Sequence, residues 1–238
     1  MKILKTTLMA LLFAMSYGCS NIHIPSDFSA QLYPNHGILV VSTTTPTFDE
    51  PVGYQLFYHV HKIGGSTVPS SPPPKQDSNA RGKRSNYIPQ KFNFRIESAQ
   101  KQEDSDFSDA DGIVFAQLLP KGKYELSRWS IATGIGLFIH PKELEPIHFD
   151  VTAGEITYLG NLHMNNSYGK NIFGVPLARG GIVSFADKEE RDMKVFKEKA
   201  PKINLPIKKQ LPQTPIWLPK GMSLSDLETI ENANPDEK

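Results

Sequence analysis

The sequence predicts an all-β fold, an antiparallel two-sheet sandwich that is followed by a C-terminal helix and an extended tail. Apolar and polar residues alternate in short segments, which is typical of strands that bury one face. Clusters of Gly, Pro, Asn and Asp separate these segments and predict turns. Eight such segments between residues 37 and 186 indicate two packed sheets.

The expected strands differ in how clearly they alternate. In residues 54–60 the even-numbered positions share one face, and in 91–97 Phe92, Phe94 and Ile96 are expected in the core. Lys91, Asn93 and Arg95 should then face solvent. The eight expected strands cover residues 38–42, 54–60, 91–97, 113–118, 124–131, 147–151, 156–162 and 182–185.

Two segments fall outside this pattern. Residues 64–90 are rich in Pro, Ser, Gly and basic residues, and we expect a flexible insertion loop there. Residues 187–200 predict a surface helix that Asp187 caps and Pro201 ends. Met193, Phe196 and Ala200 form its narrow apolar stripe.

The tail, residues 201–238, is rich in proline but carries more large apolar side chains than an inert linker. We expect residues 201–219 to wrap back over the sandwich, because burying Trp217 and its neighbours stabilises the docked state. The alternative is a free arm that a partner recognises. The apolar residues are Ile203, Leu205, Ile207, Leu211, Ile216, Trp217 and Leu218.

Charge and cysteine content exclude several classes of protein. The 26 Lys and Arg residues almost balance the 25 Asp and Glu residues, which argues against a nucleic-acid partner bound through a basic face. The single cysteine rules out an internal disulfide framework and a cysteine-cluster metal site. No apolar run reaches the roughly 18 residues of a membrane-spanning helix.

The N-terminus has the parts of an export signal. Lys2 and Lys5 precede an apolar stretch over residues 8–15, and small residues then lead to Cys19. This order resembles the signal of bacterial lipoproteins, in which cleavage between Gly18 and Cys19 makes the lipidated cysteine the mature N-terminus. An ordinary secretory signal that happens to adjoin Cys19 is the alternative.

If the resemblance holds, residues 1–18 are a lipoprotein signal peptide and residues 19–36 a tether that leads into the sandwich. The resemblance implies a lipid anchor at Cys19, in the bacterial cell envelope. Ser20 in the second mature position resembles that of lipoproteins sent to the outer membrane.

Two further segments resemble a sandwich family. Residues 118–126, LLPKGKYEL, look like the L-P-x-G-x-Y-x-L signature of transthyretin-like domains, which are also called prealbumin-like and include carboxypeptidase-regulatory-like modules. Residues 149–160 are similar to the second signature, although Ala153 stands where proline is common. The resemblance covers roughly residues 37–186 and implies a fold without a catalytic motif.

Histidines are the candidate metal ligands. His59 and His61 point to the same face of one expected strand, and His148 and His163 on later strands could complete a site. The alternative, which we favour, is surface or partly buried histidines without metal. The acidic residues 103–111 resemble a calcium loop only in composition, because Phe107 and Leu118 occupy ligand positions.

We therefore expect a non-enzymatic binding or assembly module, lipid-anchored in the envelope, that docks on an envelope protein. No nucleophile elbow or HExxH motif is present, and no cofactor is expected. A carbohydrate- or peptidoglycan-binding module is the second hypothesis, and a histidine-based metal-binding protein is the third. The second would stack sugars on Tyr33, Phe48, Trp129 and Trp217.

Overall fold

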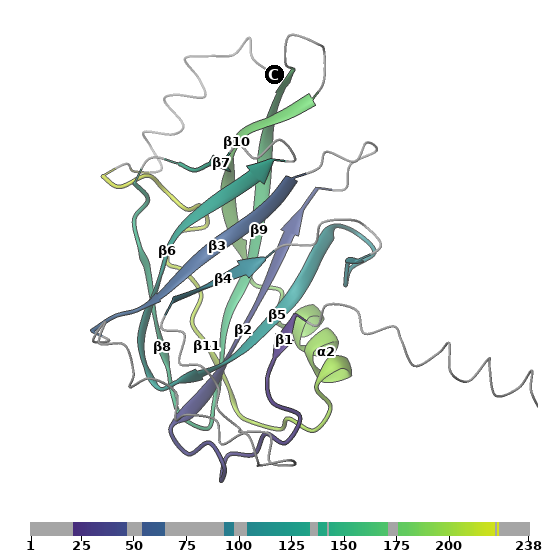
Figure 1. The fold of residues 1–238 in the computed structure, drawn as a ribbon, viewed down its shortest axis with the longest axis vertical. Helices are drawn as coiled ribbons and strands as arrows, with labels where there is room; N and C mark the ends of the chain where they lie inside the picture. The colour runs from purple at the N-terminus through teal and green to yellow at the C-terminus, as the bar shows by residue number, and fades with distance from the viewer. Residues whose placement is uncertain are drawn as a thin grey trace, which may run out of the picture.

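The computed structural model consists of two β-sheets and one helix within its described part (Figure 1). The described residues are 21–46, 54–64, 93–97, 104–133, 138–141, 143–170, 176–221 and 223. The expected signal peptide, Cys19 and nearly all of the expected insertion loop therefore lie outside the described residues, as do Phe48, Lys91 and Phe92.

Sheet A has the strand order β1-β5-β2-β9-β10, and β11 pairs with the first part of β9. Its strands are β1 (Ile22–His23), β2 (His36–Thr45), β5 (Asp111–Pro120), β9 (Ile156–Lys170), β10 (Pro176–Ala186) and β11 (Ile207–Lys209).

Sheet B has the order β4-β3-β6-β7, and β8 pairs with β6. Figure 1 shows its strands crossing those of sheet A. They are β3 (Tyr54–Lys62), β4 (Asn93–Glu97), β6 (Gly122–Thr133), β7 (Phe138–Ile139) and β8 (Ile147–Val151).

The prediction of a purely antiparallel sandwich is wrong for sheet A. All strand pairs of sheet B are antiparallel, but β1 with β5, β2 with β9 and β11 with β9 run parallel. The chain leaves sheet A after β2, returns for β5, and builds the rest of sheet B before β9. A connection of that length can bring β9 back in the direction of β2. Alternation of apolar residues carries no information about strand direction.

The main core lies between the two sheets. In β4, Ile96 is fully buried and Phe94 packs against this core, whereas Arg95 is exposed, so the predicted faces are confirmed where β4 is described. Large members of this core are Leu56, Tyr58, Val60, Phe115, Trp129, Ile131, Phe149, Leu159 and Met164.

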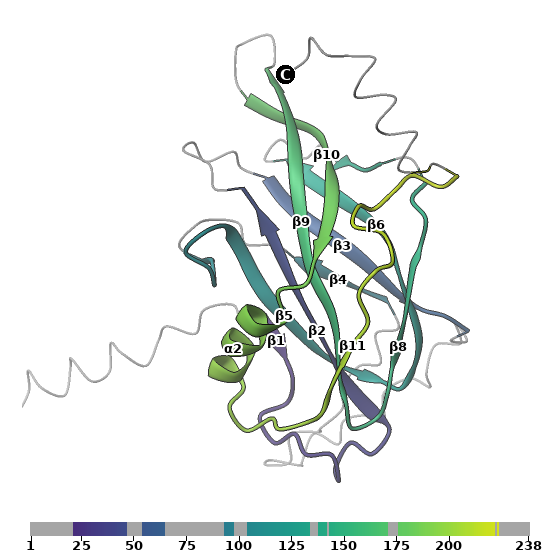
Figure 2. The same ribbon diagram turned by 180° about the vertical axis from the view of Figure 1, so that it is seen from behind.

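A second core lies on the opposite face of sheet A, where α2 (Glu189–Lys199) covers the strands (Figure 2). Met193 and Phe196 of α2 are buried there, as their spacing predicts. The N-cap residue is Lys188 and not the predicted Asp187, although the Asp187 carboxylate accepts from the backbone N–H of Glu189 (3.2 Å). Because both faces of sheet A are covered, β2 is buried along nearly its whole length.

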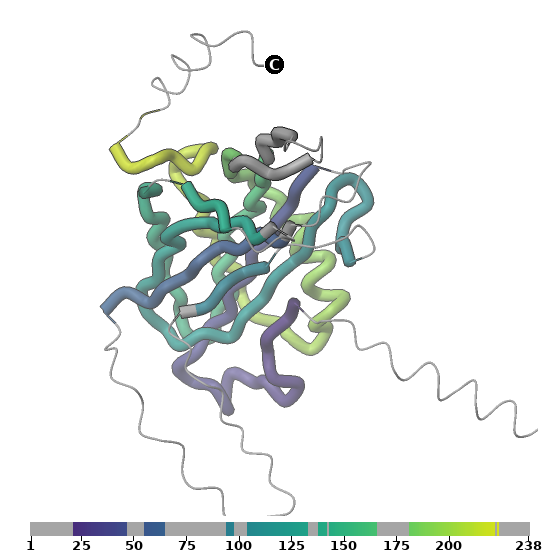
Figure 3. The backbone as a smooth tube through the Cα atoms, turned by 45° about the horizontal axis from the view of Figure 1, so that its top comes forward, coloured from purple at the N-terminus to yellow at the C-terminus, as the bar shows by residue number. Residues whose placement is uncertain are grey.

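Residues 21–36 differ from the expected tether. They pack on the sheet A side of the sandwich near α2 (Figure 3), and Ile22, Ile24 and Phe28 contact the second core. The amide of Ala116 donates to the carbonyl of Asn21 (3.0 Å), which ties the start of this segment to sheet A. A few apolar residues, spaced without a strand or helix period, are enough to dock the segment on the second core although its side chains stay partly exposed.

The C-terminal segment wraps over the sandwich, as predicted. It forms β11 on β9 and then runs past β8 (Figure 2). Trp217 is 4% exposed, its ring nitrogen donates to the carbonyl of Glu145 (2.7 Å), and its amide donates to the carbonyl of Val183 (2.8 Å). Residues after 223 lie outside the described part.

Candidate functional site

The candidate site lies on the face of sheet B that points away from sheet A, around His59. Leu56, Tyr58 and Val60 of β3 enter the core, so His59 and His61 share the opposite face, as predicted. Both histidines are partly buried.

Two arginines flank His59 in the same row of the sheet. Arg95 of β4 pairs with His59 on one side, and Arg128 of β6 pairs with it on the other. Paired residues have Cβ atoms about 5 Å apart. The row Arg95–His59–Arg128, hereafter the arginine row, therefore places three nitrogen-bearing side chains across three adjacent strands, which Figure 1 shows side by side.

A bulge in β6 places Arg128 on this face. Tyr124 and Leu126 point into the core, but further along the strand the core residues are Trp129 and Ile131. The register shifts here, so that His59 pairs with Arg128 while Val60 pairs with Leu126, and Ser127 is the extra residue. Without the extra residue, Arg128 would point into the core.

Contacts within the face hold two members of the arginine row, Arg95 and His59. The guanidinium carbon of Arg95 lies 4.6 Å from the centroid of the Phe57 ring, and Nε2 of His59 lies 2.8 Å from the Ser130 hydroxyl. Both arginines are exposed, and neither forms an ion pair with any other described residue. Their charges remain available to a ligand.

The electrostatics of the row follow from its composition. Burial, and next the positive charges of Arg128 and Arg95, together lower the pKa of His59 from 6.5 to about 4. His59 is therefore neutral near pH 7, between two fixed positive charges. Glu97 and Glu125 lie in the neighbouring rows, opposite Phe57 and His61 respectively.

The predicted histidine ligands do not meet. His163 lies on β9, and its Nδ1 is 2.9 Å from the Thr44 hydroxyl on the face of sheet A that α2 partly covers. That face and the face of His59 are on opposite sides of the sandwich. His148 pairs with Glu125 at the far side of β6. Within the described residues, no group of three or more His, Cys, Asp or Glu could hold a metal ion.

The carbohydrate-binding hypothesis needs exposed aromatic rings, but the described candidates are buried or half-buried. Trp129 and Trp217 are 3% and 4% exposed and belong to the main core. Tyr33 is half-buried and stacks on Phe28 (5.6 Å between ring centroids). These rings therefore offer no flat exposed pair.

The acidic segment before β5 is a structural turn. The Ser105 hydroxyl bonds backbone groups of the turn, including the amide and the carbonyl of Gly112 (3.0 and 3.1 Å). Asp106 accepts from the amide of Val114 (2.8 Å) and from Lys199 of α2 (2.6 Å). Its carboxylate thus fastens the turn to the helix.

A buried carboxylate on α2 is the feature that the sequence did not reveal. Asp192 is fully buried and accepts from the Ser42 hydroxyl (2.6 Å), the Tyr158 hydroxyl (2.7 Å) and Nε of Arg191 (2.9 Å). The network continues from Ser42 to Asn161, whose carbonyl oxygen accepts from Thr44. The charge of Asp192 is paired and hydrogen-bonded, so its burial is compensated. This carboxylate therefore has a structural role: it holds α2 on sheet A.

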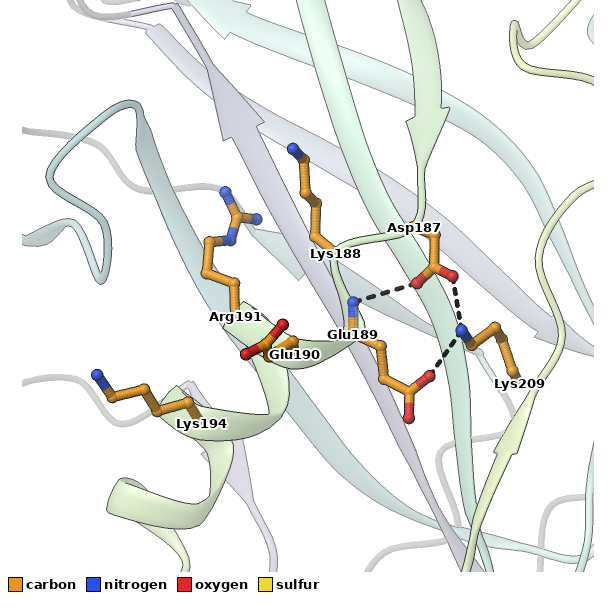
Figure 4. A pocket seen from close by; sticks show the side chains of 7 residues that line it. All are labelled: Asp187, Lys188, Glu189, Glu190, Arg191, Lys194 and Lys209. Atoms are coloured by element: carbon orange, nitrogen blue, oxygen red, sulfur yellow. Dashed lines mark hydrogen bonds and ion pairs between the residues drawn. The ribbon is translucent and has the colours of Figure 1, made fainter.

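Two surface hollows lie elsewhere. A depression of about 680 Å³ opens at the start of α2 (Figure 4), where Lys209 pairs with both Asp187 and Glu189. A groove of about 670 Å³ runs between β8 and the C-terminal segment beside Gln210. In the depression, the ammonium of Lys209 is already neutralised by carboxylates, and few charged side chains line the groove. Neither hollow is therefore chosen as the candidate site.

Sequence reasoning placed Arg95 on the solvent face but attached no function to it. Arg128 was missed, since its face depends on the bulge. The signal was present: the apolar positions change from even numbers, 124 and 126, to odd numbers, 129 and 131. Such a change of phase within one strand indicates a bulge.

Comparison of the chain with protein-family models, with curated proteins and with solved structures found no match. No helix in the described part is long and apolar enough to cross a membrane.

Proposed function

We propose that this protein is a lipid-anchored envelope lipoprotein whose sandwich acts as a non-enzymatic binding or assembly module. The anchor is Cys19, after cleavage at Gly18, and the outer membrane is its location. The arginine row carries the proposal of a binding module, because two exposed cationic side chains project from the strands that flank β3 in one sheet and pair with no carboxylate among the described residues.

The position of Cys19 supports the anchoring part. Only Ser20 separates it from Asn21, whose carbonyl is bonded into sheet A. A lipid at Cys19 would thus hold the sandwich close to the bilayer, with little freedom to move away. The two or three acyl chains of a lipoprotein bind firmly, since each buried methylene contributes about 0.8 kcal/mol.

We also propose a transthyretin-like relationship for the sandwich. The segment that carries the resemblance forms the turn from β5 to β6, and Tyr124 and Leu126 after the turn are buried. The Tyr124 hydroxyl donates to the carbonyl of Pro120 (2.7 Å), which supports a structural role for this tyrosine.

Labelling of cells with radioactive palmitate tests the anchor. Wild-type protein should be labelled and recovered with outer membranes, whereas Cys19→Ala should lose the label and leave the membrane fraction. The matched variant Ser20→Asp keeps the cysteine, so it should remain labelled but move to the inner membrane. Labelling that persists in Cys19→Ala would refute the lipoprotein proposal.

A further inference from the structure

The arginine row suggests a specific ligand chemistry. Arg95 and Arg128 each lie one strand from His59, so their Cα atoms are about 10 Å apart at the usual strand spacing. Side chains of this length can converge over the histidine between them. Two guanidinium groups that meet at one point repel each other unless an anion lies between them.

The charge of the arginine row favours a dianion over a singly charged ligand. Two guanidinium groups contribute two positive charges, and each presents a fork of N–H donors that matches the oxygens of a phosphate. A dianion neutralises both groups, whereas a single carboxylate neutralises only one. Glu97 does not take this place, because it lies one row away and its carboxylate accepts from the amide of Gln55 (3.0 Å).

Neighbouring side chains restrict two members of the arginine row. The guanidinium of Arg95 rests on the Phe57 ring, one row from His59, and this contact limits the conformations of the side chain before a ligand arrives. The imidazole of His59 is fixed by the Ser130 hydroxyl and adds a polar group between the two guanidinium groups. These contacts are present before any ligand arrives.

We propose that Arg95, His59 and Arg128 form a phosphate-binding site on the outer face of sheet B, which recognises a phosphate dianion. This inference rests on the proposed binding function and names its ligand class. The phosphate can belong to a small soluble compound or to a lipid headgroup, and the recognition chemistry is the same in both.

Equilibrium dialysis of the full mature protein in a non-ionic detergent, with radiolabelled inorganic phosphate at constant ionic strength, tests the site. Wild-type protein should bind phosphate saturably. Arg95→Gln and Arg128→Gln should each raise the Kd by about 10- to 100-fold, because each removes a charged hydrogen-bonding partner. Arg128→Lys should lie between wild type and Arg128→Gln, since it keeps the charge and loses the fork.

Lys123→Gln is the matched control. It removes one positive charge from the same strand and face, near Asp150 instead of His59. Its Kd should stay close to that of wild type. An equal loss of affinity in Lys123→Gln would overturn the proposal, because it would show diffuse attraction by surface charge. Absence of saturable phosphate binding by the wild type would overturn it as well.

Nuclear magnetic resonance of the His59 ring gives a second readout. A phosphate dianion beside His59 opposes the field of the arginines, so saturation with phosphate should raise the pKa of His59 from its lowered value. An unchanged His59 titration at saturating phosphate would contradict the site. Thermal unfolding of each variant verifies that it is folded.

A parallel dialysis against short-chain, water-soluble phosphatidic acid separates the two sources. Tighter binding of this lipid than of inorganic phosphate, lost in both arginine variants, would assign the site to a headgroup. Equal or weaker binding would assign it to a small soluble phosphate compound. Failure of phosphate binding leaves the lipid anchor intact, because palmitate labelling tests that part independently.

Discussion

Asp192 shows how much one buried carboxylate can matter on a surface helix. It joins α2 to sheet A through the hydroxyls of Ser42 and Tyr158, and Arg191 compensates its charge. Burial and the hydrogen bond to Asp192 both raise the pKa of the Tyr158 hydroxyl, so this tyrosine stays a donor. Arg191 also covers the Phe107 ring, 3.8 Å from its centroid.

Asp192→Ala should lower the free energy of unfolding by about 3–5 kcal/mol, because it leaves a buried network with unpaired donors. Glu190→Ala changes an exposed carboxylate on the same helix and should cost no more than about 0.5 kcal/mol. Urea unfolding of both variants measures the difference. Similar losses in the two variants would show that Asp192 does not fasten α2 to the sheet.

His59 should make the stability depend on pH. Its pKa falls from 6.5 to about 4 on folding. Between these two pH values the imidazole of His59 is protonated in the unfolded chain but not in the folded chain. The contribution of His59 to the stability is therefore complete above about pH 6.5 and declines as the pH falls toward about 4. The pKa values of His36 and His163 are also lowered by burial, and both add to the decline with the same sign.

His59→Asn removes one of these titrating groups and should make the decline shallower. Urea unfolding at about pH 7 and about pH 5 gives the difference in free energy for each protein. His61→Asn is the comparison on the same strand face. A decline in His59→Asn as steep as in wild type would mean that His59 is protonated in the folded protein.

At the scale of elements, the C-terminal segment behaves as part of the fold. Its contacts extend from β11 on β9 to Trp217 against Phe185 (6.0 Å between ring centroids). Lys208 and Lys209 lie within β11, so their backbone is hydrogen-bonded. The segment therefore closes one edge of β9 and covers the end of the main core.

Trp217→Ala should cost about 3–5 kcal/mol, as truncation of a buried aromatic side chain usually does. It should also speed tryptic cleavage at Lys208 and Lys209, because the segment loses its main apolar contact. Gln213→Ala, an exposed change in the same segment, should leave both properties unchanged. Rapid cleavage of the wild type at Lys208 would contradict docking of the segment.

The bulge at Gly160 is a second feature at this scale. Val40 pairs with Tyr158 but Ser42 pairs with Asn161, and Gly160 adopts a φ of +92° at this shift. A Cβ there would lie 2.9 Å from the carbonyl oxygen of Ala186 and 2.8 Å from a methyl of Leu211. The bulge turns Asn161 toward Ser42, so it is needed for the Asp192 network.

Gly160→Ala should therefore destabilise the protein by more than Gly154→Ala. Gly154 also has a positive φ, +74°, but nothing lies within 4 Å of its Cβ position. Its substitution should cost only the left-handed backbone penalty of about 1–2 kcal/mol. Thermal unfolding compares the two variants, and equal melting temperatures would show that the close approach at Gly160 relaxes without cost.

For the whole molecule, the lipid and the fold should be independent. The two cores form from residues after position 21, so removing the acyl chains removes no contact of the described sandwich. Cys19→Ala should therefore melt at the temperature of the wild-type protein, measured by circular dichroism in the same detergent. A clear drop would show that the lipid packs against the sandwich.

The sequence by itself determined the eight longer strands, most of the side chains that they bury, and the helix α2; it did not predict the short strands β1, β7 and β11. It also favoured a tail that returns to the sandwich over a free arm, since Trp217 and its apolar neighbours are stabilised by burial, and the structure confirms the return. These features follow from the local period of apolar residues and from their number, and both can be counted along a chain.

Only the tertiary structure decided which strands are neighbours and in which direction they run. The parallel pairing of β2 with β9, the burial of Asp192 and the arginine row all join residues that lie far apart in the chain. The alternation of apolar and polar residues predicts that Arg95 faces outward, but it does not predict that His59 lies beside Arg95. Pairing depends on long-range packing and on bulges that shift the register by one residue, which reverses the face of every side chain beyond them.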